Sequence, residues 1–409
     1  METGFGKDYF ARARVGLFTH YTYATYAKGK ATNWGGTWYA RNDPRPAGSA
    51  EEAAAMFDGE KYAKTAHDLG AEYVVFTLAH AGFNLLFPSR TMKEVGCPHK
   101  CTERSDIIAK LLNGLEKYNI PLVFYLPPND SHDISDDELK TMGWVSDAAR
   151  MEFLKRLIRE LYSKYGRRIR GFWFDQSGPT ADVCDLIHTY DPDAVIFVNT
   201  GVTANTEKHP LSDFIVSEYY GSIESCDSDL LPTHHSQVNR QIGNWWASGN
   251  TAPTDARSLF RYTVRTAATE GQCNAGIAWS CGPYIDQTWE DGVRELLEEL
   301  GTLLRAHEGF FGTVPGRSYV TAPNALLEKS DWGVSTESPD GKTVYLHVLN
   351  LPESGVLTLP VPADGKRFCK AESGNTLLEM QNTGSGYRIL LPEHCDPIDT
   401  VIRLTAVCE

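Results

Sequence analysis

A carboxylate ends one of the most apolar runs of the sequence. Residues 171–178 read GFWFDQSG, so Asp175 follows a stretch that suits a buried strand. Because an isolated charge is costly inside a core, we expect Asp175 to face a cavity, although an aspartate after a strand also often caps the next helix. In a cavity, a carboxylate can serve as a nucleophile or as a general acid or base.

Polar residues lie at the ends of other apolar runs as well. His20 lies in RVGLFTHY, His80 ends EYVVFTLAH, Tyr125 lies in PLVFYLPP and Glu218 lies in FIVSEYY. If these runs are parallel strands, their carboxyl ends meet at one edge of the sheet, and the side chains converge on one pocket. Each residue has an ordinary alternative, such as a buried, hydrogen-bonded histidine, so the prediction depends on their joint occurrence.

Aromatic residues lie near the same strand ends and loops, mixed with Asn, Gln and His. Such a mixture suits a carbohydrate, because sugar faces stack on aromatic rings while hydroxyls need fixed polar partners; aromatic residues nevertheless belong more often to a core. The candidates for sugar contacts are His20, Trp38, Tyr39, His80, Tyr125, Trp173, Trp245, Trp246 and Trp279.

The elements that must position these residues alternate between two patterns. Continuously apolar runs, typical of strands buried on both faces, lie at 14–21, 72–80, 121–128, 170–176, 194–200, 214–220 and 274–281, and 241–248 could supply another. Amphipathic stretches at 49–70, 104–120, 146–166 and 289–311 predict helices. The alternation predicts an α/β fold with a (β/α)8 TIM-like barrel over residues 1–315. An open doubly wound sheet is the alternative, but no Gly-rich phosphate loop follows the first strand.

The remaining residues have a different pattern. Short alternating strands at 340–352, 355–362, 387–392 and 399–407 are separated by Gly, Pro, Asp and Asn. This pattern predicts an antiparallel β-sandwich as a C-terminal domain over residues 316–409.

Composition excludes some classes of partner. The net charge of −14 argues against nucleic acid, and no apolar run is long enough to predict a membrane span. The nine cysteines are odd in number, which indicates reduced thiols. We expect a cytoplasmic protein, or a secreted or periplasmic one if a signal peptide has been removed, and a homo-oligomer remains open.

One short segment has spacing typical of metal ligands. Cys97, His99 and Cys101 lie within CPHKC, but no second ligand pair lies nearby in the sequence. A surface loop is therefore the favoured interpretation of this segment.

Several motifs, in order along the chain, resemble those of the family-29 α-L-fucosidases. RVGLFTHYTY resembles the family's GIFIHWG, GTWY its EWY, TLAHAGF its TKHHDGF and GFWFDQSG its LWFDG. The stretch from AWSCGPYIDQTWEDG to GTVPGRSY resembles the family's NIGPKPDG segment, the helix after it and AIYGTRP. DWGVSTESPDGKTVYLHVLNLP resembles the family's β-sandwich. The resemblance covers nearly the whole chain.

This resemblance implies a retaining exo-glycosidase that acts on an oligosaccharide or glycoconjugate. Asp175 would be the nucleophile, and His20, Trp38 and His80 would contact the sugar; no metal or organic cofactor would be needed. Retention requires a second carboxyl group about 5–5.5 Å from the nucleophile. Glu218 is the candidate for this acid/base, with Asp213, Glu224 and Asp227 as weaker alternatives.

Several positions depart from the family pattern. Thr37 stands where the family has the glutamate of EWY, Ala79 and Ala81 replace a histidine and an aspartate of TKHHDGF, and Gln237 aligns near the family's WETC glutamate. An arginine that often follows the fifth strand is replaced near Thr200. The default substrate is an α-L-fucoside, and a different sugar is the alternative.

Two further classes stay open. The changes at Ala79 and Gln237 suit a sugar-binding protein that has lost catalysis. A metal-dependent barrel hydrolase would use His20, His80 and Asp175 as ligands, but the first strand carries no His-x-His pattern.

Overall fold

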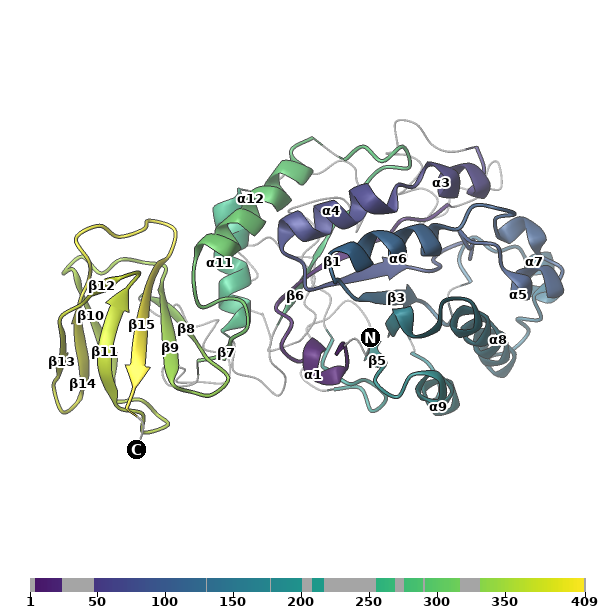
Figure 1. Cartoon of the computed structure of the whole chain (residues 1–409). Coiled ribbons are helices and arrows are strands. Elements are labelled where there is room, and N and C mark those ends of the chain that lie inside the picture. Colours follow the sequence, from purple (N-terminus) through teal and green to yellow (C-terminus); the bar gives the residue numbers. More distant parts are fainter. Residues whose placement is uncertain are drawn as a thin grey trace.

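A curled sheet of six parallel strands forms the centre of the N-terminal region (Figure 1). The computed structural model describes residues 4–23, 48–129, 131–176, 178–200, 208–216, 255–268, 276–289, 291–316 and 332–407. The strand order is β5-β4-β3-β2-β1-β6. The strands are β1 (Val15–Thr19), β2 (Tyr73–Thr77), β3 (Leu122–Leu126), β4 (Ile169–Phe174), β5 (Val195–Val198) and β6 (Ile277–Ser280).

Helices lie between consecutive strands and cover the outer face of the sheet (Figure 1). Each parallel connection needs such a crossover. These helices are α3 (Ala50–Met56), α4 (Gly59–Leu69), α5 (Arg90–Glu94), α6 (Ile107–Lys117), α7 (Asp136–Thr141), α8 (Asp147–Tyr165), α9 (Ala181–Tyr190) and α11 (Ala256–Ala267), with short 3-10 turns η1 (Pro98–Lys100) and η2 (Gly166–Arg168). In addition, α1 (Lys7–Phe10) precedes β1 and α12 (Val293–Ala306) follows β6.

The amphipathic stretch 49–70 forms two helices, not the single helix that the sequence predicts. The Asp58 side chain accepts hydrogen bonds from the backbone N–H groups of Glu60 and Lys61 and so begins α4 as a new N-cap. Immediately after it, Gly59 packs closely against α6: a Cβ atom added at Gly114 would lie 2.1 Å from the Gly59 carbonyl oxygen. The break thus lets α4 and α6 pack backbone to backbone.

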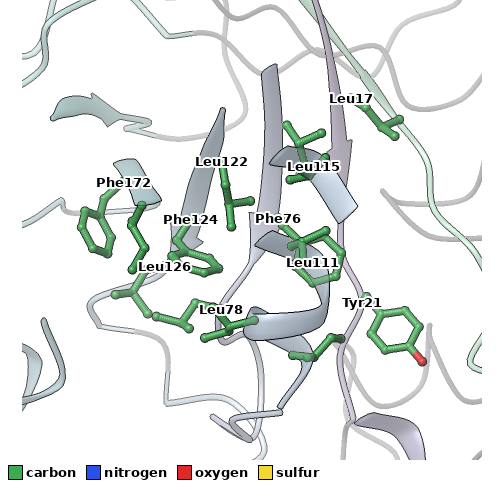
Figure 2. Close-up of a cluster of buried hydrophobic side chains, with 14 of the residues drawn as sticks. Leu17, Tyr21, Phe76, Leu78, Leu111, Leu115, Leu122, Phe124, Leu126 and Phe172 are labelled. Atoms are coloured by element: carbon green, nitrogen blue, oxygen red, sulfur yellow. The ribbon is translucent and has the colours of Figure 1, made fainter. Parts of the chain in front are cut away.

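Strand alternation produces two separate cores, which explains the continuously apolar runs. Phe76, Leu122 and Phe124 point outward and pack with Leu111 and Leu115 of α6 (Figure 2). The inward-facing residues form a second cluster, which includes Phe18, Val75, Val123, Tyr125 and Trp173. Because burying each such side chain contributes about 1.5–3 kcal/mol, the sheet is stabilised from both faces.

The described strands form a curled half-barrel. The sequence predicts a strand at 214–220, of which the structure describes residues 214–216. Just before them, the Asp213 N–H donates a hydrogen bond to the Ile196 carbonyl of β5. The rest of that run and the stretch 241–248 lie outside the described residues. The fold is therefore α/β with a parallel half-barrel, and closure to eight strands stays a prediction.

Two antiparallel sheets follow, in the orders β10-β14-β13 and β12-β11-β15-β9-β8-β7. Their strands are β7 (Val314–Pro315), β8 (Gly333–Glu337), β9 (Thr343–Val348), β10 (Val356–Pro360), β11 (Phe368–Ser373), β12 (Thr376–Leu377), β13 (Met380–Asn382), β14 (Gly386–Leu390) and β15 (Thr400–Ala406). Apolar residues of both sheets, such as Leu346, Leu359 and Ile389, share one core. Because β7 already pairs with β8, the second sheet begins just before the expected boundary at residue 316.

Polar contacts join the two regions. Arg261 of α11 donates to the Leu349 carbonyl, and Arg403 of β15 pairs with Glu308 at 3.0 Å. Within the described part of the chain, no helix is both long and apolar enough to cross a membrane.

Candidate active site

Five of the predicted residues lie close together at the carboxyl ends of neighbouring strands. His20 follows β1, His80 follows β2, Tyr125 lies near the end of β3, and Trp173 and Asp175 lie at the end of β4. Strand alternation turns His20, Tyr125, Trp173 and Asp175 to the inner face of the sheet. His80 lies beyond the end of β2, at the start of a turn, and reaches the same cluster from there. The structure therefore brings together His20, His80, Tyr125, Trp173 and Asp175 through the ring contacts and hydrogen bonds described below.

Asp175 is held by two side-chain donors. The Tyr125 hydroxyl donates to Asp175 Oδ2 at 2.7 Å, and the Asn199 amide donates to Oδ1 at 3.0 Å. Burial raises the pKa of Asp175 above its ordinary value, while the hydrogen bond from Tyr125, the charge of His80 and the amide of Asn199 act to lower it. The carboxylate is thus oriented and partly desolvated, two properties that suit a nucleophile.

Aromatic rings line the cluster on one side. Trp173 stacks on Tyr125 with 5.3 Å between ring centroids, and Tyr125 stacks in turn on His80 at 5.5 Å with an interplanar angle of 11°. The indole Nε1–H of Trp173 is buried and has no hydrogen-bond partner among the described residues. The stack fixes the Tyr125 hydroxyl next to Asp175.

His20 is neutral, and one of its ring nitrogens is already committed. Thr77 Oγ1 donates to the Thr19 carbonyl at 3.0 Å and lies within hydrogen-bond distance of His20 Nδ1. Because the Thr77 proton is used, His20 Nδ1 must be the donor, which leaves Nε2 as an acceptor. Burial holds the pKa of His20 well below its ordinary value, and His80 adds to this effect.

His80 has the opposite arrangement. Its Nδ1 accepts a hydrogen bond from the Ala81 N–H at 2.7 Å, so in the neutral ring Nε2 carries the proton and is a donor. The two imidazole rings pack edge to face with centroids 4.8 Å apart. In this state the two Nε2 atoms differ: that of His20 is an acceptor and that of His80 is a donor.

The structure does not bring Trp279 into this cluster. Its ring is buried in the outer core, and its Nε1–H donates to Thr263 of α11. Register explains this position, because Trp279 pairs with the outward-facing Leu17 of β1, whereas Ser280 pairs with the inward-facing Phe18. The expected sugar contact by Trp279 is therefore replaced by a structural role.

The other predicted residues have separate outcomes. Asp213 forms an ion pair with Lys7 at 2.6 Å and accepts from the Ile196 N–H, so its carboxylate is engaged at the edge of β5. The remaining predicted contacts and acid/base candidates lie outside the described residues: Trp38, Tyr39, Glu218, Glu224, Asp227, Trp245 and Trp246, together with the altered positions Thr37 and Gln237.

Two polar residues of the cluster are absent from the sequence prediction. Asn199 follows β5 and Thr77 ends β2, and both lie at positions equivalent to those of the predicted residues. A polar residue at the end of an apolar run is the signal that predicts His20 and Asp175, and the end of AVIFVNT carries the same signal at Asn199.

The segment from Cys97 to Cys101, which the sequence offers as a possible metal site, forms the short turn η1. The Cys101 thiol lies within hydrogen-bond distance of the Ser89 and Pro98 carbonyls, and His99 Nε2 lies 3.1 Å from Glu138. Among the residues that the structure describes, no three His, Cys, Asp or Glu side chains gather as they would around a metal ion.

Comparisons with known proteins identify the family and the fold of this chain. The family model for alpha-L-fucosidase matches residues 6–308. A bacterial fucosidase with a triazole inhibitor is 18% identical, with a TM-score of 0.69, over 98% of this chain and 94% of that one. A GH29 alpha-L-fucosidase from Bacteroides thetaiotaomicron, trapped as a covalent intermediate in complex with 2-fluoro-fucosyl fluoride through a glutamate-to-glutamine mutant, is 18% identical with a TM-score of 0.66, over 98% and 95% of the two chains.

A more distant structure has the same fold. The alpha-fucosidase of Thermotoga maritima in complex with fucose is 16% identical with a TM-score of 0.63, over 99% of this chain and 98% of that one. None of the curated protein sequences compared with the chain matches it. The family model covers well over half of the sequence, so the chain belongs to the alpha-L-fucosidase family and is a glycoside hydrolase.

Proposed function

We propose that this protein hydrolyses terminal α-L-fucosides with retention of configuration, through a covalent glycosyl-enzyme on Asp175. The observation that carries the proposal is the position of Asp175: a partly buried carboxylate at the end of β4, held by Tyr125 and Asn199 beside two histidines. The covalent intermediate trapped in the Bacteroides thetaiotaomicron relative supports the same chemistry here.

In the first step, an oxygen of Asp175 attacks the anomeric carbon while a protonated carboxyl group gives its proton to the leaving oxygen. Tyr125 and Asn199 hold the attacking carboxylate, so little reorientation is needed at the moment of reaction. In the second step, water attacks the glycosyl–Asp175 ester, and the same carboxyl group, now ionised, takes the proton of the water. The sugar is released with its original configuration.

The surrounding side chains suit a sugar ring. We assign the Nε2 atom of His20 as an acceptor and that of His80 as a donor toward sugar hydroxyls, and the Trp173 indole N–H as a further donor. Trp38, Tyr39, Trp245 and Trp246 remain candidates for stacking from the loops. Ala79 stands where the family has a histidine, and it is fully buried among apolar residues. The loss of this histidine favours a sugar that makes fewer polar contacts near Ala79, or a sugar other than fucose.

Glu218 is the proposed acid/base. It follows β5 in the chain, and a glutamate was the residue replaced in the trapped relative. A Glu218→Ala variant should lose activity on unactivated fucosides, and azide should restore turnover of an activated aryl fucoside. Unchanged turnover of the unactivated substrate by this variant would assign the role to another carboxyl group.

Covalent labelling tests the proposal directly. The protein is incubated with 2-fluoro-fucosyl fluoride, digested, and the peptides are analysed by mass spectrometry; the label is expected on the peptide that contains Asp175. A panel of aryl glycosides, with α-L-fucoside and α-L-galactoside first, identifies the sugar. A label on a different carboxylate would overturn the assignment of Asp175, whereas turnover of another glycoside in place of the fucoside would overturn only the sugar.

A further inference from the structure

A buried lysine lies behind the turn that carries His80. Lys100 belongs to η1, in the segment that the sequence marks as a possible metal site, and only 1% of its surface is exposed. Its ammonium group donates to the Gly82 carbonyl at 2.7 Å and pairs with Glu138 of α7 at 3.0 Å. Burying an ammonium group is costly unless it is paired and hydrogen-bonded, so both contacts are needed to keep Lys100 in this position.

The turn itself has an unusual backbone. Gly82 has a φ of +80° and Phe83 a φ of +46°; for a residue other than glycine this conformation costs about 1–3 kcal/mol and persists only when the surrounding structure fixes it. The His80 carbonyl accepts from the Phe83 N–H at 2.8 Å, and the Gly82 N–H donates to the His132 carbonyl at 2.7 Å. The two backbone polar groups of Gly82 are thus both bonded, the N–H to His132 and the carbonyl to Lys100.

Glu138 is a firm support for this lysine. Partial burial acts to raise the pKa of Glu138, but hydrogen bonds from Ser135, His99 and Lys100 outweigh it and lower the pKa to about 2. Ser135 and Glu138 also form a capping box that begins α7. A carboxylate that stays ionised at neutral pH therefore connects Lys100 to the start of a helix.

We propose that Lys100 is a positioning residue for His80: its ammonium group fixes the 80–83 turn and, through that turn, the orientation of the His80 imidazole ring. The link is short, because His80 Nδ1 accepts from the Ala81 N–H of the same turn and the ring stacks on Tyr125. Lys100 does not touch the substrate in this scheme. The catalytic consequence of the inference rests on the proposed function, whereas its structural part does not.

The chain offers a matched control. Lys110 of α6 also donates to main-chain carbonyls, those of Ala54 and Ala55 at 2.8 Å and Phe57 at 3.1 Å, and so joins α6 to the end of α3. Lys100→Met and Lys110→Met each remove an ammonium group that fastens a loop. Only the first acts on the turn that carries His80.

The experiment compares both variants with the parent by 15N NMR of the imidazole rings, with the His80 signals assigned from a His80→Gln variant. We expect the His80 ring nitrogens to shift in Lys100→Met and to stay unchanged in Lys110→Met, although both variants melt at lower temperature. On an aryl α-L-fucoside well below the melting temperature, kcat/KM should fall about 10-fold to 100-fold in Lys100→Met only. Lys100→Arg, which keeps a cation, should recover part of the loss.

Unchanged His80 signals in Lys100→Met, with a melting temperature lowered as in Lys110→Met, would overturn the proposal and leave Lys100 a purely structural residue. If Lys100→Met does not fold, Glu138→Gln replaces it; this variant keeps the shape of the side chain but removes its charge, and the same His80 shift is expected. If the parent does not cleave the fucoside and the His80 shift is still seen, the proposed function fails and the positioning role stands.

Discussion

Two clusters among the residues that the structure describes each combine a histidine with a carboxylate and a hydroxyl group, and they have different roles. One is the cluster around Asp175. The other lies in the C-terminal sheets, where His347 Nδ1 is 2.7 Å from Asp399 and His347 Nε2 is 3.2 Å from Thr336 Oγ1. By residue type alone, the second cluster looks more like the hydroxyl–histidine–carboxylate arrangement of a hydrolase.

Solvent access separates the two clusters, and the C-terminal one also lacks the proton direction of such a hydrolase. In a catalytic arrangement the hydroxyl gives its proton to the histidine, but Thr336 donates to the Gly309 carbonyl on the loop after α12. Thr336, His347 and Asp399 are at most 1% exposed, whereas Asp175 is partly exposed and the following Gln176 is exposed. The C-terminal cluster therefore fastens the sheets to the half-barrel, and the comparison teaches that solvent access matters more than residue types.

The largest effect is expected from Asp175→Asn. Loss of the nucleophile should lower kcat/KM on an aryl α-L-fucoside by about 10³-fold or more. The melting temperature should hardly change, because the amide keeps the shape of the side chain and removes a partly desolvated charge. Steady-state kinetics and a thermal melt measure both quantities, and activity close to that of the parent would contradict the role of Asp175.

Asp399→Ala should have the opposite profile. It leaves His347 buried without its carboxylate, and breaking such a pair typically costs about 3–5 kcal/mol of unfolding free energy. Urea unfolding measures this loss, while kcat/KM of the folded fraction should stay within about twofold of the parent value. A selective loss of kcat/KM without loss of stability would show that the two clusters are not as different as we infer.

Tyr125→Phe should have an intermediate effect on the Asp175 cluster. A hydrogen bond to a charged group contributes about 1.5–3 kcal/mol, so kcat/KM should fall roughly 10-fold to 100-fold. Burial already raises the pKa of Asp175, and losing the Tyr125 donor raises it further. Since Asp175 must be ionised to attack, the acid limb of the pH–kcat/KM profile should move to higher pH.

Tyr162→Phe is the matched control for Tyr125→Phe. The Tyr162 hydroxyl is buried and has no hydrogen-bond partner among the described residues, so its removal should change neither kcat/KM nor the acid limb. A Tyr125→Phe profile that coincides with that of Tyr162→Phe would mean that the contact with Asp175 has no catalytic value.

The smallest effect is expected from Thr77→Val. This change keeps the volume of the side chain but removes the acceptor that holds the His20 Nδ1 proton, and one such hydrogen bond contributes about 1 kcal/mol, or roughly fivefold in kcat/KM. Thr77→Ser should restore the parent value. The 15N shifts of His20 report its tautomer, and an unchanged tautomer in Thr77→Val would contradict our assignment of the donor.

The sequence determines much of this protein by local pattern. Residue type and position relative to an apolar run were enough to predict His20, His80, Tyr125 and Asp175 as one group, because parallel strands bring their carboxyl ends to one edge. The change from continuous to alternating patterns near residue 316 likewise marked the antiparallel sheets, since a strand buried on both faces has no polar side.

Tertiary structure decided what an apolar run cannot encode. The run NAGIAWSC does not alternate between polar and apolar residues, so its pattern does not tell which face Trp279 takes. Its register against β1 sends Trp279 outward. The donors on Asp175 and the support of the His80 turn by Lys100 come from segments far apart in the chain. The direction of the Thr336 proton depends on where the loop after α12 lies. Such contacts are set by packing in three dimensions, because hydrogen bonds depend on distances and angles that sequence spacing does not fix.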